Sequence, residues 1–178
     1  MKEYKRQVFV INGSAGVGKD TFCNLVGKYV PTRVVSSVDS IKALMKQMGW
    51  NGEKTERDRK FMSDLKDLTT EYNDYPMNCI REKVKAFLDD NMWGCHDAVN
   101  THRVLFLHIR EPKEIQRAVG EFHAQTILIT NPNVEHLTSN HADANVGKYV
   151  YNFYINNGGT LDDLEDIAKA FCEDEGLI

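Results

Sequence analysis

The stretch that decides the fold of this chain is Gly13-Ser-Ala-Gly-Val-Gly-Lys19-Asp20-Thr21. Its first seven positions fit the pattern G-x-x-x-x-G-K, in which the backbone N–H groups of a glycine-rich loop converge on phosphate oxygens. Residues 7–12, just before it, are apolar and β-branched, as in a buried parallel strand. Residues 20–29, just after it, carry apolar side chains at helical spacing. Strand, glycine-rich turn and helix in this order predict an α/β fold with a phosphate-binding loop at the positive end of the helix.

The position after the lysine departs from the usual pattern. Asp20 stands where a serine or threonine hydroxyl normally ligates Mg²⁺, and Thr21 comes one place late. We expect Asp20 to hold the metal directly or through a water, with Thr21 as the second candidate ligand. A carboxylate beside a triphosphate is repulsive unless a cation lies between them, so nucleotide binding should depend steeply on the metal.

The loop therefore predicts ATP and Mg²⁺ as the cofactors. Lys19 would lie on the β and γ phosphates and act as a catalytic residue, because its charge stabilises the group that is transferred. The alternative is a glycine-rich turn that merely joins a strand to a helix. The predicted cofactor-binding residues are Gly13, Ser14, Ala15, Gly16, Val17, Gly18, Lys19, Asp20 and Thr21.

The composition is that of an ordinary globular protein. Hydrophobic residues make up 42% and charged residues 27% of the 178 residues, and the net charge is −4. This balance gives no reason to expect nucleic-acid or membrane binding, and no apolar run approaches the roughly 20 residues that span a bilayer. The N-terminal residues lack the pattern of a signal peptide, and the four cysteines are too far apart to suggest a disulfide framework. We expect a cytoplasmic protein, a monomer or homodimer, whose partners are small molecules.

Strand and helix signals alternate along the chain. Strands are predicted at residues 7–12, 33–38, 104–109, 126–129 and 149–155. Helices are predicted at residues 20–29, 39–48 and 112–122, and after the N-cap Thr160. Two further helices are expected between residues 53 and 90, on either side of Asn73-Asp-Tyr-Pro76. This long stretch without a strand signal indicates a helical insertion.

A loop that ends in Gly-Lys-Asp-Thr, followed by a basic helical insertion and a strand that ends in arginine, resembles the nucleoside monophosphate kinase branch of the P-loop proteins. In pattern it is similar to phage-type deoxynucleoside monophosphate kinases and to animal-type phosphomevalonate kinases. The resemblance covers nearly the whole chain. It implies a three-layer α/β/α P-loop fold with a five-stranded parallel sheet in one domain, residues 1–178. It also implies a helical acceptor-binding insertion at about residues 50–100 and a short lid at about residues 131–148.

The same resemblance implies which residues bind the phosphoryl acceptor. After the second strand, Asp39 and Lys42 fall in the segment that approaches the acceptor. In the insertion, Arg59 and Lys60 fall where the family directs cations at the acceptor's phosphate, a task that suits the planar fork of arginine. Arg110, at the end of the third predicted strand, would bind the acceptor and take part in catalysis, because ligands of open α/β sheets lie at the carboxyl ends of the strands.

Simpler explanations exist for these residues. The acidic residues Glu56, Asp58, Asp64 and Asp67 alternate with the basic ones, as on a solvated helix held by salt bridges. Arg110 could equally be a surface arginine at a strand end.

Two features depart from the family. His108 stands where the family has an aspartate that supports Mg²⁺, and we assign it no role. The lid contains no arginine and offers only His136, His141 and Lys148. Because an arginine in a lid contributes about 10³ to 10⁵ in rate, either a cation from elsewhere, such as Arg117, replaces it or turnover is slow.

The sequence thus predicts transfer of the γ-phosphoryl group of ATP to a nucleoside or deoxynucleoside monophosphate. One alternative acceptor is another phosphorylated metabolite, similar to phosphomevalonate. A pocket for a base would distinguish the two. A further alternative is a regulatory protein that binds ATP with little transfer activity, which the missing lid arginine and His108 favour.

Overall fold

The sheet of the protein has five strands, all parallel. The computed structural model describes residues 4–89, 101–134, 146 and 149–178. Within them the strand order is β2-β3-β1-β4-β5. The strands are β1 Arg6–Asn12, β2 Thr32–Ser36, β3 Arg103–His108, β4 Gln125–Thr130 and β5 Phe153–Asn156. The predicted five-stranded parallel sheet is confirmed.

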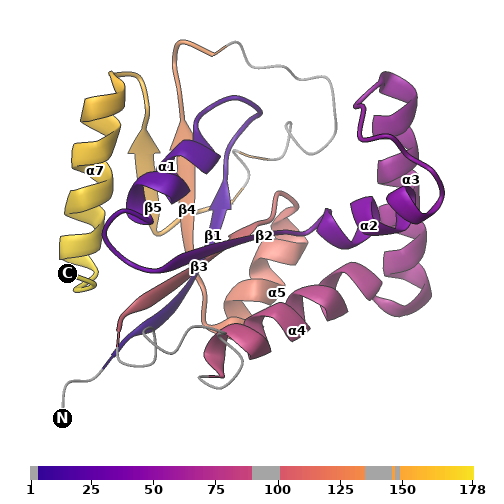
Figure 1. The fold of residues 1–178 in the computed structure, drawn as a ribbon, viewed down its shortest axis with the longest axis horizontal. Helices are drawn as coiled ribbons and strands as arrows, with labels where there is room; N and C mark the ends of the chain where they lie inside the picture. Colours follow the sequence, from indigo (N-terminus) through magenta and orange to yellow (C-terminus); the bar gives the residue numbers. More distant parts are fainter. Residues whose placement is uncertain (1–3, 90–100, 135–145, 147–148) are drawn as a thin grey trace.

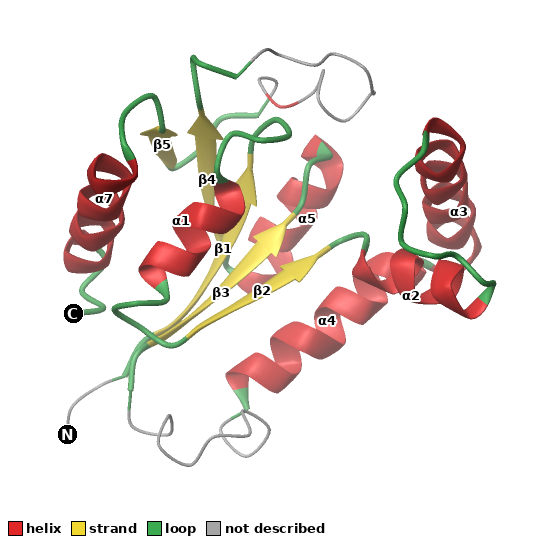
Figure 2. Cartoon of the chain, turned by 45° about the horizontal axis from the view of Figure 1, so that its top comes forward, coloured by secondary structure: helices red, strands yellow, loops and turns green. Residues whose placement is uncertain are grey.

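The central strand β1 is buried on both faces, and its side chains alternate between two cores. Phe9 and Ile11 pack with helices α1, Lys19–Val26, and α7, Leu161–Asp174. Val8 and Val10 pack with α4, Tyr75–Leu88, and α5, Pro112–Phe122. Helices therefore cover both faces of the sheet (Figure 2), and the predicted three-layer α/β/α architecture is confirmed.

Two further helices lie beyond the β2 edge of the sheet, α2 Asp39–Gln47 and α3 Glu56–Asn73 (Figure 1). Helix α3 begins with a capping box, in which Thr55 and Asp58 bond each other's backbone N–H groups. It contacts α2 and α4 but has no fully buried residue. The helices predicted between residues 53 and 90 are confirmed as α3 and α4.

Two elements have an end that differs from the prediction by three residues or more. Strand β5 begins at Phe153 rather than at residue 149, because Asn152 Oδ1 accepts a hydrogen bond from the backbone of Thr126 (2.9 Å) in place of a strand carbonyl. Helix α1 ends at Val26 rather than at residue 29. After Gly27, the backbone N–H groups of Lys28 and Tyr29 donate to carbonyls three positions back, as Tyr29 N does to Val26 O (3.0 Å), and this tighter turn ends the α-helix.

Other predictions on elements have mixed outcomes. Thr160 is the N-cap of α7, as predicted, and forms a capping box with Asp163. The predicted lid residues 135–145 and 147–148, with His136, His141 and Lys148, lie outside the described residues. No helix in the described part of the chain has both the length and the apolar composition needed to cross a bilayer.

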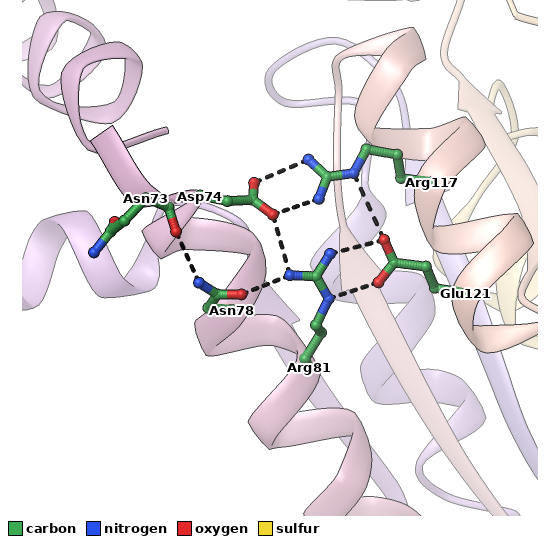
Figure 3. A network of polar contacts seen from close by, with 6 residues as sticks. All are labelled: Asn73, Asp74, Asn78, Arg81, Arg117 and Glu121. Atoms are coloured by element: carbon green, nitrogen blue, oxygen red, sulfur yellow. Dashed lines mark hydrogen bonds and ion pairs between the residues drawn. The ribbon is translucent and has the colours of Figure 1, made fainter. Parts of the chain in front are cut away.

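An ion-pair network joins the helical insertion to the main body of the fold (Figure 3). Asp74, between α3 and α4, has a left-handed backbone with φ of 58° and accepts hydrogen bonds from Arg81 of α4 and Arg117 of α5. Glu121 of α5 in turn accepts from Arg81 Nε at 2.6 Å. The hydrogen bonds from Arg117 lower the pKa of Asp74 despite its partial burial. Arg117 is therefore held in this network, and the suggestion that it replaces a lid arginine stays a prediction.

Replacing Asp74 tests how much this network stabilises the fold. We expect Asp74→Asn to lower the free energy of unfolding by about 1–2 kcal/mol, because two arginines lose a charged acceptor. Asp74→Ala should cost about 1 kcal/mol more, since alanine adopts a left-handed backbone less readily than asparagine. Urea denaturation measures both values. The pKa of Asp74 is lowered in the fold, so the deficit of the Asn variant should hold at neutral pH and shrink below the ordinary aspartate pKa. A deficit independent of pH would contradict the electrostatic origin.

Candidate active site

The loop between β1 and α1 has a backbone that requires glycine at two of its positions. Gly13, Gly16 and Gly18 have φ values of 146°, 80° and 99°. A Cβ atom on Gly13 would lie 2.4 Å from the carbonyl oxygen of Ile129, and one on Gly18 would lie 2.3 Å from Asn157 Nδ2. The loop is therefore packed closely against the ends of β4 and β5. Its outer part, Ala15 and Gly16, is exposed.

Lys19 lies over this loop. Its ammonium group donates hydrogen bonds to the carbonyl oxygens of Gly13 and Ser14, each at 2.7 Å. Helix α1 begins at Lys19, and its first helical bond runs from Phe22 N to Gly18 O (2.9 Å). The N–H groups of the first turn have no acceptor within the helix and carry the positive end of its dipole. A cation, a helix N-terminus and a glycine loop thus converge at one place, which is the arrangement that binds phosphate groups.

A buried asparagine holds the base of the loop. Asn12, fully buried, accepts a hydrogen bond from the backbone N–H of Gly13 (2.8 Å) through Oδ1. Its Nδ2 donates to the Tyr151 hydroxyl (2.8 Å) and to the carbonyl of Arg110 (3.3 Å). The Tyr151 hydroxyl donates to the carbonyl of Val146 (2.9 Å). These bonds were not predicted from the sequence, although Asn12, a polar residue at the end of an apolar strand, could have indicated a buried hydrogen-bonding role.

A second asparagine supports the loop from the other side. Asn157 follows β5, and its Nδ2 donates to the carbonyl of Val17 at 2.9 Å. Its backbone N–H donates to the carbonyl of Thr130 at 2.7 Å, at the end of β4. This contact could not be predicted from the sequence, because Asn157 and Val17 are 140 positions apart.

His108 is the point at which several predicted site residues meet. Its Nδ1 lies 3.7 Å from Asp20 Oδ1, and its Nε2 lies 3.8 Å from Cys23 Sγ. Burial lowers the pKa of His108, Asp20 and Asp39 raise it, and Lys19 and Arg110 lower it further. Four predicted site residues from three segments, namely Lys19 and Asp20, Asp39, and Arg110, therefore lie within electrostatic range of one imidazole ring.

The residues predicted to hold Mg²⁺ fit that ion. Asp20 and Thr21 lie in the first turn of α1, and the Asp20 side chain is 87% exposed. Both offer the hard oxygen ligands that Mg²⁺ takes, usually one or two from protein, with phosphates and waters supplying the others. Among the described residues, no cluster of three or more acidic, histidine or cysteine side chains could hold a metal on its own. The donors present therefore suit a metal that arrives with a nucleotide.

The residues predicted to bind the acceptor fall into two groups. Asp39 and Lys42 lie at the start of α2, where Asp39 accepts from the backbone N–H of Ser36 (2.8 Å) and pairs with Lys42 Nζ (3.3 Å). Arg59 and Lys60 lie on the exposed first turns of α3. Arg59 Nε donates to the carbonyl of Lys54 (3.0 Å).

Lys60 pairs with Asp64 at 2.5 Å, one helical turn away. This is the kind of ion pair that the solvated-helix explanation expects, so the role of Lys60 toward an acceptor stays a prediction.

A hollow of about 550 Å³ lies between the end of α2 and the first half of α3. Aromatic, thioether, basic and acidic side chains all line it. The lining residues are Met45, Met48, Gly49, Trp50, Arg57, Asp58, Lys60, Phe61 and Asp64. Trp50 was not singled out from the sequence, and only the return of the chain from α2 to α3 brings it to the same hollow as Phe61.

The architecture and the loop together define the class of fold. The chain has the three-layer α/β/α P-loop fold, with the glycine loop between its central strand and first helix. The structure is similar to the tunicamycin resistance protein from Deinococcus radiodurans, with a TM-score of 0.51, 13% sequence identity and 98% of each chain covered. At this identity the likeness concerns the fold alone.

Two other solved structures are similar with lower scores. TT1252 from Thermus thermophilus has a TM-score of 0.47 and 16% identity, over 97% of this chain and 98% of that one. Shikimate kinase from Aquifex aeolicus has a TM-score of 0.47 and 11% identity, over 96% of this chain and 99% of that one. We draw no conclusion from these two. No family model matches the chain, and no curated protein matches its sequence.

Alanine at the loop glycines tests the packing of the loop. We expect Gly13→Ala to lower the free energy of unfolding by about 3 kcal/mol, because the backbone carbonyl of Ile129 cannot move out of the way of a Cβ atom. Gly16→Ala is the matched control: among the described residues only Val134 Cγ1 lies within 4 Å of the added Cβ atom, at 3.7 Å, so the cost should be about 1–2 kcal/mol from the positive φ alone. Urea denaturation compares the two. Equal losses would show that close packing does not fix the loop.

Proposed function

We propose that the chain is an ATP-dependent phosphotransferase that moves the γ-phosphoryl group of ATP onto the phosphate of a nucleoside or deoxynucleoside monophosphate. The observation that carries this proposal is the loop at residues 13–21. There a helix N-terminus, positive-φ glycines and the Lys19 ammonium converge on one exposed site.

On the donor side, the loop backbone of residues 13–18 holds the phosphates. Lys19 moves from the carbonyls of Gly13 and Ser14 to the β and γ phosphates, a short swing for a side chain already held over the loop. Asp20 and Thr21 hold Mg²⁺, which when bound neutralises charge on the transferring group. Asn12 and Asn157 keep the loop in shape through bonds to Gly13 N and Val17 O.

The transfer itself needs no nucleophile from the protein. Phosphoryl transfer is accelerated mainly by placing the acceptor oxygen in line with the γ phosphorus and by cations on the developing charge. Arg110 follows β3, and its backbone is held by Asn12 Nδ2. Lys19 and Arg110 both lower the pKa of His108, so two cations lie near one point at the carboxyl end of the sheet. We assign Lys19 to the donor and Arg110 to the acceptor.

On the acceptor side, the hollow between α2 and α3 favours a nucleotide over a small phosphorylated metabolite. Phe61 and Trp50 offer apolar rings on which a base can stack, worth about 1–3 kcal/mol per base. Asp58 and Asp64 offer acceptors for the amino and imino groups of a base. Arg57, Arg59 and Lys60 supply positive charge for the phosphate, and Asp39 and Lys42 flank its approach at the start of α2.

Two alternatives keep the same fold. A kinase for a metabolite similar to phosphomevalonate has no use for the aromatic lining of the hollow. A regulatory protein that binds ATP with little transfer is favoured by the sequence of the predicted lid, residues 131–148, which contains no arginine. We retain as parts of the proposal a single domain of residues 1–178 and a monomeric or homodimeric state.

Removing the Lys19 ammonium tests the donor site. We expect Mg·ATP at about 100 times its Kd to raise the apparent stability of the unaltered chain by roughly 2.7 kcal/mol. Lys19→Ala should lose most of this stabilisation and all measurable turnover, because the phosphates lose their cation. Thermal unfolding with and without Mg·ATP, and ADP release with a panel of nucleoside monophosphates and phosphomevalonate, provide the measurements. Lys28→Ala, just beyond the other end of α1, is the control and should behave as the unaltered chain. Binding without turnover on any acceptor would favour the regulatory protein.

Phe61 and Leu68 form a matched pair for testing the acceptor site. Both are exposed apolar residues of α3, at 41% and 64%, but only Phe61 lines the hollow. We expect Phe61→Ala to raise the KM for the acceptor about tenfold, through loss of stacking, and to leave the KM for ATP unchanged. Leu68→Ala should change neither value. Steady-state kinetics with the best acceptor of the panel decides the question, and equal effects of the two variants would remove the hollow from the acceptor site.

A further inference from the structure

His108 and Asp20 face each other across the junction of β3 and α1. The backbone of His108 is fixed on both sides, because β3 lies between β1 and β2 and His108 pairs with Ile11 and with Ser36. Its carbonyl also accepts from Ser37 N at 3.1 Å. The first turn of α1 is fixed through Phe22 and Cys23, both buried in the core. Two rigid elements therefore hold His108 Nδ1 and Asp20 Oδ1 3.7 Å apart.

The environment of the ring determines which nitrogen carries the proton. Cys23 Sγ lies 3.8 Å from Nε2, within the range of a hydrogen bond from its thiol S–H. A protonated thiol donates to Nε2, which leaves Nδ1 as the N–H that points at Asp20. The Asp20 side chain is 87% exposed, so a small rotation brings its carboxylate into hydrogen-bonding range of that N–H.

P-loop proteins usually divide the grip on Mg²⁺ between two residues. A hydroxyl after the loop lysine ligates the metal, and a carboxylate at a neighbouring strand supports it from behind. This chain has a carboxylate, Asp20, after the loop lysine and an uncharged hydrogen-bond donor, His108, at the strand end. The carboxylate and the uncharged hydrogen-bonding group have therefore exchanged positions, and the latter is an imidazole instead of a hydroxyl. One carboxylate is retained, and it stands on the helix instead of the strand.

Building on the proposed function, we propose that His108 is a positioning residue that orients the Asp20 carboxylate toward Mg²⁺. The carboxylate then stands after the loop lysine, where the hydroxyl usually is, and the group that supports it stands at the strand end, where the carboxylate usually is. One carboxylate oxygen accepts from His108 Nδ1, and the other stays available to the metal. The imidazole itself binds neither metal nor nucleotide. Because it acts through Asp20, its removal weakens binding of the metal–nucleotide complex and leaves binding of the metal-free nucleotide unchanged.

The test measures how much Mg²⁺ the protein needs when it binds ADP, which holds the ion only weakly in solution. Thermal unfolding is followed at fixed ADP while Mg²⁺ is varied, and in parallel with ADP and a chelator. We expect His108→Ala to need about tenfold more Mg²⁺ for half-maximal stabilisation, as is typical when the residue that orients a metal ligand is lost. His108→Asn, whose amide N–H₂ takes the place of Nδ1, should stay near the value of the unaltered chain. With ADP and chelator, all three proteins should be stabilised alike.

A double variant makes the exchange itself testable. Asp20→Ser alone should raise the Mg²⁺ requirement, because the hydroxyl has no carboxylate behind it. Asp20→Ser combined with His108→Asp restores the usual order and should bring the requirement back toward that of the unaltered chain. This rescue distinguishes positioning from a merely structural role, since two independent losses of packing would add.

Each outcome bears on the proposal. Three results would overturn the role of His108 and leave the proposed function intact. They are an unchanged Mg²⁺ requirement in His108→Ala, an equal loss of stabilisation by ADP when the chelator is present, and the absence of rescue in the double variant. If the unaltered chain shows no stabilisation by ADP or ATP under any condition, the proposed function fails, and this inference fails with it.

Discussion

The Asn12 amide is the contact on which the arrangement of the site depends. It is fully buried at the carboxyl end of the central strand, where an unsatisfied polar group would cost about 1–3 kcal/mol. Its oxygen accepts from the first loop N–H, and its nitrogen donates to the carbonyl of Arg110 and to the hydroxyl of Tyr151. One side chain thereby ties the phosphate-binding loop to the segment after β3 and to the chain that leads into β5. The loop, Arg110 and the approach to β5 consequently keep fixed positions relative to one another.

The charges of the site are gathered by the order of the strands. Because β3 lies between β1 and β2, the ends of these three strands present the loop, His108 and the start of α2 side by side. Lys19, Asp20, Asp39 and Arg110 consequently act on the same imidazole. Two cations and two carboxylates therefore lie near one point at the carboxyl end of the sheet, a mixture of charge that suits a ligand in which phosphates carry a cation. His108 stands where the kinases that the sequence resembles have an aspartate, and the fold places the Asp20 carboxylate 3.7 Å from its ring.

The helical insertion obeys a different constraint. Helix α3 has no fully buried residue and cannot be held by a core of its own. Its position depends on α2 and α4, on the Lys66–Glu114 pair to α5 (2.8 Å), and on the Asp74 network. An element without fully buried residues, held in part by ion pairs, is easier to displace than one packed against the sheet, because water competes for those polar contacts. The hollow beside Trp50 and Phe61 lies on this element.

The sequence by itself determined the features that depend on neighbours along the chain. Glycine at positions 13, 16 and 18, apolar runs in the strands, helical periodicity and the capping pair Thr160 and Asp163 act within a few residues, so the P-loop fold and its loop could be predicted. Only the tertiary structure decided the contacts between distant segments. Asn12 and Tyr151 are 139 positions apart, and His108 and Cys23 are 85 positions apart. Nor could local propensity show that the Asn152 side chain would replace a strand carbonyl and shorten β5, or that Arg117 would be taken by Asp74. These outcomes depend on which groups the packed sheet and helices bring together, because a buried or charged group takes the partner that the fold places within reach.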